Sequence, residues 1–489
     1  MSTTLQPRGR VVAVILYAAA NVQPRLTSAI LVMIYARVFS LSEFGVYGVL
    51  VSLTVILGIV ADLGLPSAIL RNYYDRHDDP KSAATYLSSV LRGSRVLALC
   101  MIPAIGLALY LMWDLAGIGR ALIWYFLPIL LGVSYFDRSS EILAAICRAI
   151  ERPDFHAIGR TMQGLASIAA GVVLVVVFDG GVVGAMVGLL VSRSVASVAY
   201  LFLLSKTIAF GSKGAGWAEL RGCLAFGLPL VPNQIAAWLR QPALRPLLAH
   251  IVSLSQVGLF SLASSVASLP LILSSAVDFA LSPVYFRRRV SMTPDFRAKI
   301  VTFAEIQLAV LFPVWMFAIL FCSNIVHAFA SGRFHEAVPT CAALFCAAFA
   351  RFQHPFFIRQ IEFLRNTWVM PLVTGSGTAL AIVLTLTLAG QYGIIASAWA
   401  VTLSDAAILF GLAWAVGRRE NVDYPMGMSF LLLVILAIAA IWSGMGEPFP
   451  LIAVPRLAAK IAIFGFSVLA SGTIWIWPRR EFIERLVRG

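Results

Sequence analysis

Polar side chains recur at helical spacing inside stretches that are otherwise apolar, and arginine is prominent among them. In residues 121–147, Ser134, Arg138, Glu141 and Arg148 occupy positions i, i+4, i+7 and i+14, which share one helix face. A guanidinium stays charged and offers paired donors that suit phosphate, so this pattern predicts a cationic site for an anionic ligand. The candidate ligand-binding residues are Asn21, Arg25, Arg138, Arg240, Arg245 and Arg351.

These arginines also have a structural interpretation, in which each one pairs with a nearby acid. Arg138 could pair with Asp137 or Glu141, and Arg351 could pair with Glu362. Acids inside apolar stretches could instead bind a driving Na⁺ ion or a proton, or serve in structural hydrogen bonds. The candidates for ion coupling are Asp62, Asp278, Glu305 and Asp405. Apart from such an ion, no cofactor is expected.

Sequence motifs for enzymes and ATP-driven pumps are missing. The stretch 211–216 has the composition of a phosphate-binding loop, but its spacing is wrong and no strand precedes it. No nucleophile elbow, metal-binding helix or dinucleotide fingerprint occurs. The six cysteines lie in apolar segments without metal-ligand spacing, so we expect small core residues and no metal site.

The elements that must carry these residues are membrane-spanning helices. The chain has 489 residues, of which 60% are hydrophobic and 12% charged, whereas soluble domains are about 45–50% apolar and about 25% charged. A spanning helix needs about 20 apolar residues. This criterion predicts an all-α integral membrane protein with about fourteen spans, at 11–36, 44–70, 84–112, 121–147, 158–178, 182–205, 223–249, 257–285, 300–330, 337–358, 367–389, 393–416, 426–443 and 457–477.

The net charge of +14 could suggest nucleic acid, but its distribution argues against that partner. One set of alternate links carries 24 lysines and arginines, and the other set carries 4. This positive-inside pattern places both termini in the cytoplasm and brings the basic links to anionic lipid headgroups. Ala18 to Ala20 imitate a signal-peptide cleavage site, but the helical pattern resumes after Arg25, so we expect a retained first helix.

An internal repeat divides the chain. Residues 36–45 (ARVFSLSEFG) and 249–258 (AHIVSLSQVG) share five identities at an offset of 213 residues, which also carries Arg138 onto Arg351. Repeats of this kind are typical of secondary transporters, whose substrate site lies between the repeats. The pattern predicts two pseudo-symmetric six-helix bundles, at 1–206 and 207–419. A final helix pair with an interfacial cytoplasmic tail would occupy 420–489.

Residues 35–48 (YARVFSLSEFGVYG) and 61–71 (ADLGLPSAILR) resemble the N-terminal signature of polysaccharide transporters. These are Wzx-type O-antigen and exopolysaccharide flippases of the multidrug/oligosaccharidyl-lipid/polysaccharide exporter superfamily. The resemblance implies a non-enzymatic flippase of a bacterial cytoplasmic membrane. It would move undecaprenyl-pyrophosphate-linked oligosaccharide to the outer leaflet by alternating access, with a polysaccharide polymerase among its partners. The family's cationic central cavity would include Arg25, Arg138 and Arg351.

Three other functions compete with this interpretation. A multidrug exporter of the same superfamily would favour an acidic or aromatic pocket, which the buried arginines oppose. A membrane polysaccharide polymerase or ligase usually carries a long outer loop, and none of the outer links here is long. A non-enzymatic scaffold for a synthesis complex would need neither the repeat nor the buried charges.

Overall fold

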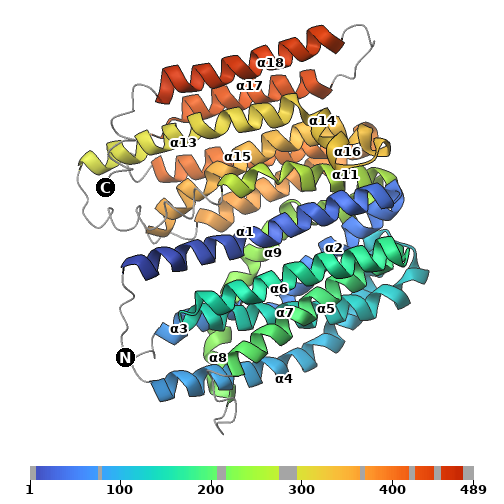
Figure 1. Cartoon of the computed structure of the whole chain (residues 1–489), viewed down its shortest axis with the longest axis vertical. Helices are drawn as coiled ribbons and strands as arrows, with labels where there is room; N and C mark the ends of the chain where they lie inside the picture. Colours follow the sequence, from blue (N-terminus) through green and yellow to red (C-terminus); the bar gives the residue numbers. More distant parts are fainter. Residues whose placement is uncertain are drawn as a thin grey trace. The chain divides into compact units, whose positions relative to one another are not determined.

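The computed structural model describes residues 7–74, 80–205, 216–274, 294–363, 369–417, 424–444 and 453–476, and the regular secondary structure in them is helical (Figure 1). This confirms the predicted all-α fold class. The chain forms two compact units, residues 1–258 and 259–489.

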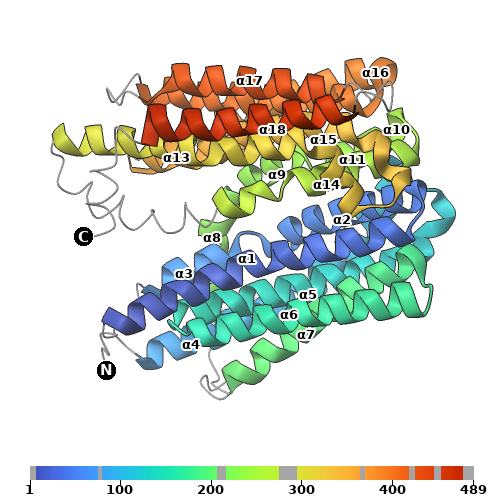
Figure 2. The same ribbon diagram turned by 45° about the horizontal axis from the view of Figure 1, so that its top comes forward.

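In the first unit, α5 packs on α7 and α6 packs on both α7 and α1 (Figure 2). α4 packs on α5 and α8. One core joins α3, α4, α5, α7 and α8 through fully buried side chains such as Tyr86, Leu143 and Tyr200. The helices of the first unit are α1 (Pro7–Val38), α2 (Leu41–Asp62), α3 (Leu65–Tyr74), α4 (Pro80–Met112), α5 (Ile123–Ala149), α6 (Pro153–Val172), α7 (Gly181–Ser205), α8 (Gly216–Gly227), α9 (Val231–Arg240), α10 (Leu244–Ile251) and the start of α11 (Leu254–Ala267).

The ends of α2 follow from local sequence. Ser40 caps its start: the Glu43 amide donates to the Ser40 hydroxyl, and the Ser40 amide donates to the Glu43 carboxylate. Two residues with positive φ, Leu63 at 49° and Gly64 at 70°, terminate the helix and turn the chain into α3.

The predicted span at 223–249 is broken into α8, α9 and α10. A short 3₁₀ turn at Leu228–Leu230 separates the first two helices, and residues 241–243 separate the last two. The second break begins at Gln241, which has φ −140°. Gln241 precedes Pro242, and the residue before a proline is disfavoured in the α conformation. Pro246 lies in the first turn of α10, where a helix tolerates proline.

In the second unit, α15 packs against α13, α16 and α17. Gly393 has φ 64° inside α16 and divides it into two arms, which match the predicted spans 367–389 and 393–416. The predicted span 300–330 is a pair of helices, α13 and α14, bent by 70°. The helices of this unit are α13 (Pro294–Leu320), α14 (Cys322–Phe329), α15 (Val338–Phe363), α16 (Val369–Gly417), α17 (Met426–Gly444) and α18 (Ala453–Ala470).

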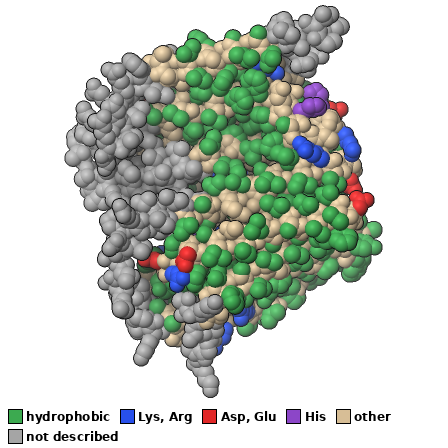
Figure 3. Space-filling view, in the orientation of Figure 1, with side chains coloured by type: hydrophobic (Ala, Val, Ile, Leu, Met, Phe, Trp, Pro, Cys, Tyr) green, Lys and Arg blue, Asp and Glu red, His purple; other side chains and the backbone are tan. Residues whose placement is uncertain are grey.

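Within the described residues, nine helices are long and apolar enough to cross a membrane, or ten if the bent pair is one span. The predicted count of about fourteen is therefore not confirmed. α5 is not among the nine, because the polar residues of the candidate site lower its hydropathy. Large apolar side chains such as Trp124, Phe178 and Phe466 are exposed, and hydrophobic side chains cover much of the surface seen in Figure 3. Lipid is the natural solvent for such a surface.

Some predictions concern residues outside this description. The bundle boundaries near 206 and 419 fall in the stretches 206–215 and 418–423, so that division stays a prediction. The interfacial tail after residue 478 and the coupling candidate Asp278 also lie outside the described residues.

Candidate functional site

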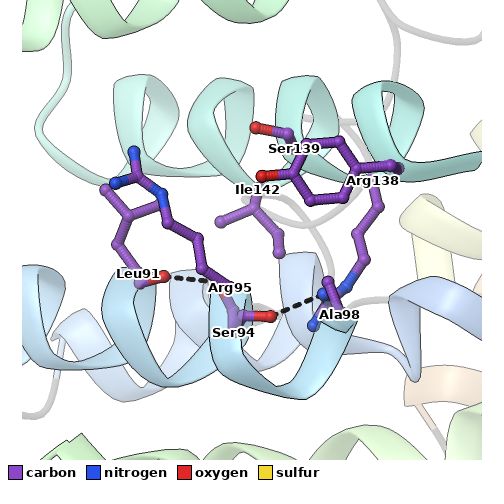
Figure 4. A pocket seen from close by; sticks show the side chains of 8 residues that line it. Leu91, Ser94, Arg95, Ala98, Arg138, Ser139 and Ile142 are labelled. Carbon is purple, nitrogen blue, oxygen red and sulfur yellow. Dashed lines mark hydrogen bonds between the residues drawn. The ribbon is translucent and has the colours of Figure 1, made fainter. Parts of the chain in front are cut away.

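The polar face of α5 lies inside the first unit, with Arg138 at its centre. The Arg138 side chain reaches α4 and donates from Nη1 to the Ser94 carbonyl oxygen at 2.6 Å (Figure 4). Arg138 is only 3% exposed. Its Nε and Nη2 atoms are buried and have no hydrogen-bond partner among the described residues. Since a buried donor without a partner is costly, this guanidinium can accept a further ligand.

A small pocket adjoins Arg138 between α4 and α5 (Figure 4). Its cavity volume is about 10 Å³, close to the space that one water molecule needs. An anionic headgroup would therefore have to displace α4 from α5 in order to enter. The lining residues are Leu91, Ser94, Arg95, Ala98, Tyr135, Arg138, Ser139 and Ile142.

The acids beside Arg138 on α5 pair with other arginines. Asp137 lies 2.9 Å from Arg193 on α7, and Glu141 lies 2.8 Å from Arg160 on α6. The structural interpretation predicted that Arg138 pairs with Asp137 or Glu141. In the structure these acids pair with Arg193 and Arg160 instead. The acid that interacts electrostatically with Arg138 is Asp62, at the end of α2.

In the second unit, the half-buried Arg351 and the buried Asp405 form an ion pair between α15 and α16. Arg351 donates from Nε and Nη2 to Asp405 Oδ2, at 3.1 and 2.5 Å. The Asp405 side chain is fully buried, and its backbone carbonyl lies 2.9 Å from His354 Nε2. Two residues predicted for separate roles, ligand binding and ion coupling, are therefore direct partners. The side chain of Glu362, the partner expected for Arg351, lies outside the description.

The remaining candidates are scattered. Arg25 is exposed on α1, and the Asn21 side chain is outside the description. Arg240 ends α9, while Arg245 lies in α10 with a buried Nε that has no hydrogen-bond partner among the described residues. Glu305, on α13, is half-buried. The structure thus pairs Arg351 directly with Asp405 and places Asp62 within electrostatic range of Arg138, and the assignment of the site as a whole stays a prediction.

Sequence reasoning overlooked three arginines that belong to this arrangement. Arg193 stands in the middle of an apolar segment, where any charge is costly and warrants attention. Arg160 lies near the start of the predicted span 158–178, but α6 begins earlier, at Pro153, and proline in a first turn is a helix-start signal that places Arg160 well inside the helix. Arg95 lines the pocket beside Arg138.

In the described part of the chain, no group of three or more His, Cys, Asp or Glu residues could hold a metal ion. Five of the six cysteines are buried, as expected. Cys100 is exposed on α4, so it is not the core residue that its apolar setting suggested.

Residues 12–288, more than half of the sequence, match a family described as polysaccharide biosynthesis protein. The chain belongs to this family. No curated protein matches it. In fold, this family member is similar to the lipid II flippase MurJ in an inward closed conformation, with a TM-score of 0.70 and 15% identity over 96% of this chain and 100% of that one.

It is also similar to a multidrug resistance MATE family transporter in an inward-facing conformation, with a TM-score of 0.60 and 15% identity over 86% of this chain and 99% of that one. A MATE transporter from Vibrio cholerae gives a TM-score of 0.54 and 14% identity, over 86% and 96% of the two chains. At such identities the likeness concerns the fold alone. This polysaccharide biosynthesis protein is therefore a multi-pass membrane protein with the fold of flippases and exporters, in agreement with the resemblance seen in its first seventy residues.

Proposed function

We propose that this protein is a flippase for undecaprenyl-pyrophosphate-linked oligosaccharide, the repeat unit of an O-antigen or exopolysaccharide. It would carry the polar head from the inner to the outer leaflet of a bacterial cytoplasmic membrane, with both termini cytoplasmic. Membership of the polysaccharide biosynthesis family and the flippase-like fold support this function. A charged sugar–pyrophosphate head needs such a path, because moving an ionised group into hydrocarbon is prohibitively costly.

The observation that carries the proposal is the environment of Arg138. Its guanidinium is 3% exposed, and two of its nitrogens have no hydrogen-bond partner among the described residues. Phosphate oxygens satisfy such donors in charge-assisted hydrogen bonds. Arg95 adds a second cation to the same pocket. The pyrophosphate would bind here only if α4 and α5 moved apart, because the present cavity holds no more than about one water molecule.

The other predicted ligand-binding residues support this proposal unequally. Arg351 already gives two donors to Asp405, so it would contact the substrate only if that ion pair opened. Arg245 retains a buried donor without a hydrogen-bond partner in the described part of the chain. We keep the exposed Arg25, with Asn21 and Arg240, as contacts for the sugar or the pyrophosphate.

Coupling to Na⁺ or H⁺ is a further part of the proposal. Asp62 is the best placed of the four candidates, since its buried Oδ1 atom has no hydrogen-bond partner among the described residues. Asp405 is committed to Arg351. Glu305 is half-buried on α13, and Asp278 lies outside the description.

A multidrug exporter is the second candidate, favoured by the likeness to MATE transporters. The acids on the polar face of α5 argue against a pocket for organic cations, since Asp137 and Glu141 are each paired with an arginine. A polymerase or ligase activity would need a reactive centre, and the sequence offers no motif for one. We therefore assign transport without catalysis. Lipids and a polysaccharide polymerase are the proposed partners.

The test is reconstitution of the purified protein in liposomes that carry a fluorescent undecaprenyl-pyrophosphate oligosaccharide. A membrane-impermeant glycosidase added outside should reach only part of the glycan in empty liposomes and nearly all of it when the protein is active. The Arg138→Glu protein is the matched control. Unchanged glycan access with the wild-type protein, together with transport of cationic dyes, would establish the exporter instead.

A further inference from the structure

The two copies of the repeated motif touch each other. At the start of α2, a Cβ atom on Gly45 would overlap the carbonyl oxygen of Leu254 and lie 3.1 Å from the amide nitrogen of Gly258. At the start of α11, a Cβ atom on Gly258 would overlap the carbonyl oxygen of Leu41 and lie 3.1 Å from the amide nitrogen of Gly45. Each contact is the other's equivalent at the offset of 213 residues. All four residues belong to the first unit.

Each helix start at this crossing is capped by its own residues. Ser40 and Glu43 form a capping box on α2. On α11 the Gln256 amide donates to the Ser253 hydroxyl at 3.4 Å. The first amides of a helix need partners from outside the helical ladder. Since these local caps provide them, separating α2 from α11 would not uncover the amides that they satisfy.

Two turns further along α2, Ser52 makes a different kind of attachment. Its hydroxyl donates to the Pro242 carbonyl at 2.5 Å, and its carbonyl accepts from Trp238 Nε1 at 2.9 Å. These bonds fasten α2 to the break between α9 and α10. Because α10 leads directly into α11, a change of angle at this break would move the start of α11 while Ser52 keeps its partners.

We propose that the Gly45–Gly258 crossing is a seal that opens and closes during transport, with the break at residues 241–243 as its hinge. Glycine lets the two backbones approach closely enough to exclude water. The crossing lies at the end of α1 remote from the N-terminus, which the predicted topology places at the outer surface. This inference rests on the proposed transport function and specifies the part of the protein that closes the outer side.

The experiment compares Gly45→Ala and Gly258→Ala with Gly222→Ala. The last is a matched control, because Gly222 is an exposed glycine of α8 whose added Cβ would meet nothing within 4 Å. All three changes gain similar helix propensity. The reporter is Val49→Cys in a Cys100→Ser background. Val49 is fully buried, one turn beyond Gly45 on the same face of α2. The readout is labelling by a membrane-impermeant maleimide added outside cells.

We expect the reporter to be labelled slowly in the parent protein and several-fold faster in both alanine variants, with the Gly222→Ala control unchanged. Labelling should respond in the same way in cells that make no lipid-linked glycan, so the seal is tested apart from the substrate assignment. Parent-like labelling in both alanine variants at normal abundance would overturn the proposal. If the alanine variants do not accumulate, labelling of the parent protein gives the answer. Complete protection of Val49→Cys from the maleimide in actively transporting cells would also overturn the proposal.

Discussion

Arg351 and Asp405 form an ion pair whose counterpart in the first unit, Asp137 and Arg193, has its charges exchanged. Asp137 on α5 and Arg351 on α15 lie within one residue of the repeat offset, as do Arg193 on α7 and Asp405 on α16. In the first unit the pair joins α5 to α7. In the second unit it joins α15 to the second arm of α16, which is the equivalent of α7 at the repeat offset. The two repeats therefore share the requirement for an ion pair at this place but not its polarity.

Exchanging the charges of Arg351 and Asp405 should preserve the stability of the second unit. Removing one member of a buried pair costs about 3–5 kcal/mol, and Asp405 is the fully buried member of this pair, whereas Arg351 is 21% exposed. We expect Asp405→Ala to lower protein abundance sharply and the double change Arg351→Asp with Asp405→Arg to restore most of it. The measurement is membrane abundance together with the temperature of aggregation in detergent.

The corresponding exchange of Asp137 and Arg193 serves as the matched comparison. If Arg351 acts only as a structural partner, export should recover along with abundance in the exchanged protein. Restored abundance without export would assign Arg351 to the substrate. If the exchanged protein is no more abundant than the Asp405→Ala protein, other side chains around the pair must require the positive charge at residue 351 and the negative charge at residue 405.

Much of the fold was predictable because its signals are local. Apolar length located most spans, and the turn glycines Gly181 and Gly393, with φ of 52° and 64°, lie at or one residue before the starts of the predicted spans 182–205 and 393–416. Pro242 and Pro246 favour kinks in the span 223–249, and the break at residues 241–243 contains the first of them. The break before α9 and the bend between α13 and α14 were missed. Hydropathy averages over a window and does not register where a helix changes direction.

The partners of the buried charges were predictable only in part. Helical periodicity placed Arg138 on an inward face correctly, since that depends on one helix. Its Ser94 partner is a backbone carbonyl on α4, and a carbonyl has no signature in the sequence. Arg351 pairs with a residue 54 positions away, because the packing of α15 on α16 decides which acid is near. Sequence proximity favoured the closer acids instead.

The predicted orientation can be tested with two exposed glycines that have open space around their Cα atoms. Gly119 lies in the link before α5, and Gly222 lies on α8. Both should be replaced by cysteine in a Cys100→Ser background, because Cys100 is the exposed native thiol in the described part of the chain. We expect an impermeant maleimide outside intact cells to label Gly119→Cys but not Gly222→Cys.

Permeabilised cells provide the control, since both cysteines should then be labelled. The positive-inside distribution of lysine and arginine is the physical basis of this expectation. The opposite pattern, with Gly222→Cys labelled from outside, would invert the topology and place both termini outside the cytoplasm.

Asp62 offers a test of ion coupling. Asp62→Asn keeps the side-chain volume and removes the charge. If Asp62 carries the driving ion, the variant should keep normal abundance, and glycan transport in liposomes should no longer respond to an imposed Na⁺ or H⁺ gradient. Glu305→Gln is the matched change at a half-buried acid. A gradient response equal to that of the wild type in Asp62→Asn would remove Asp62 from the coupling mechanism.

Arg138 decides between substrate binding and structural support. Arg138→Glu places a negative charge in the pocket, and Arg138→Lys keeps the charge but loses the paired donors. If the pyrophosphate binds here, Arg138→Glu should abolish export at normal abundance, with lipid-linked oligosaccharide accumulating in the inner leaflet. Arg138→Lys should retain partial export. The effect should far exceed the loss of a surface ion pair, which is worth about 0–1 kcal/mol.

The neighbouring ion pair supplies the structural comparison. Glu141 pairs with Arg160 and not with Arg138, so adding Glu141→Gln to Arg138→Glu should not rescue export. A structural role for Arg138 predicts instead that abundance falls in Arg138→Glu and recovers when Asp62 is changed to Asn, because Asp62 is the acid that interacts electrostatically with residue 138. Normal export by a stably inserted Arg138→Glu protein would exclude Arg138 from the substrate site. The pocket between α4 and α5 would then be a packing defect filled by water.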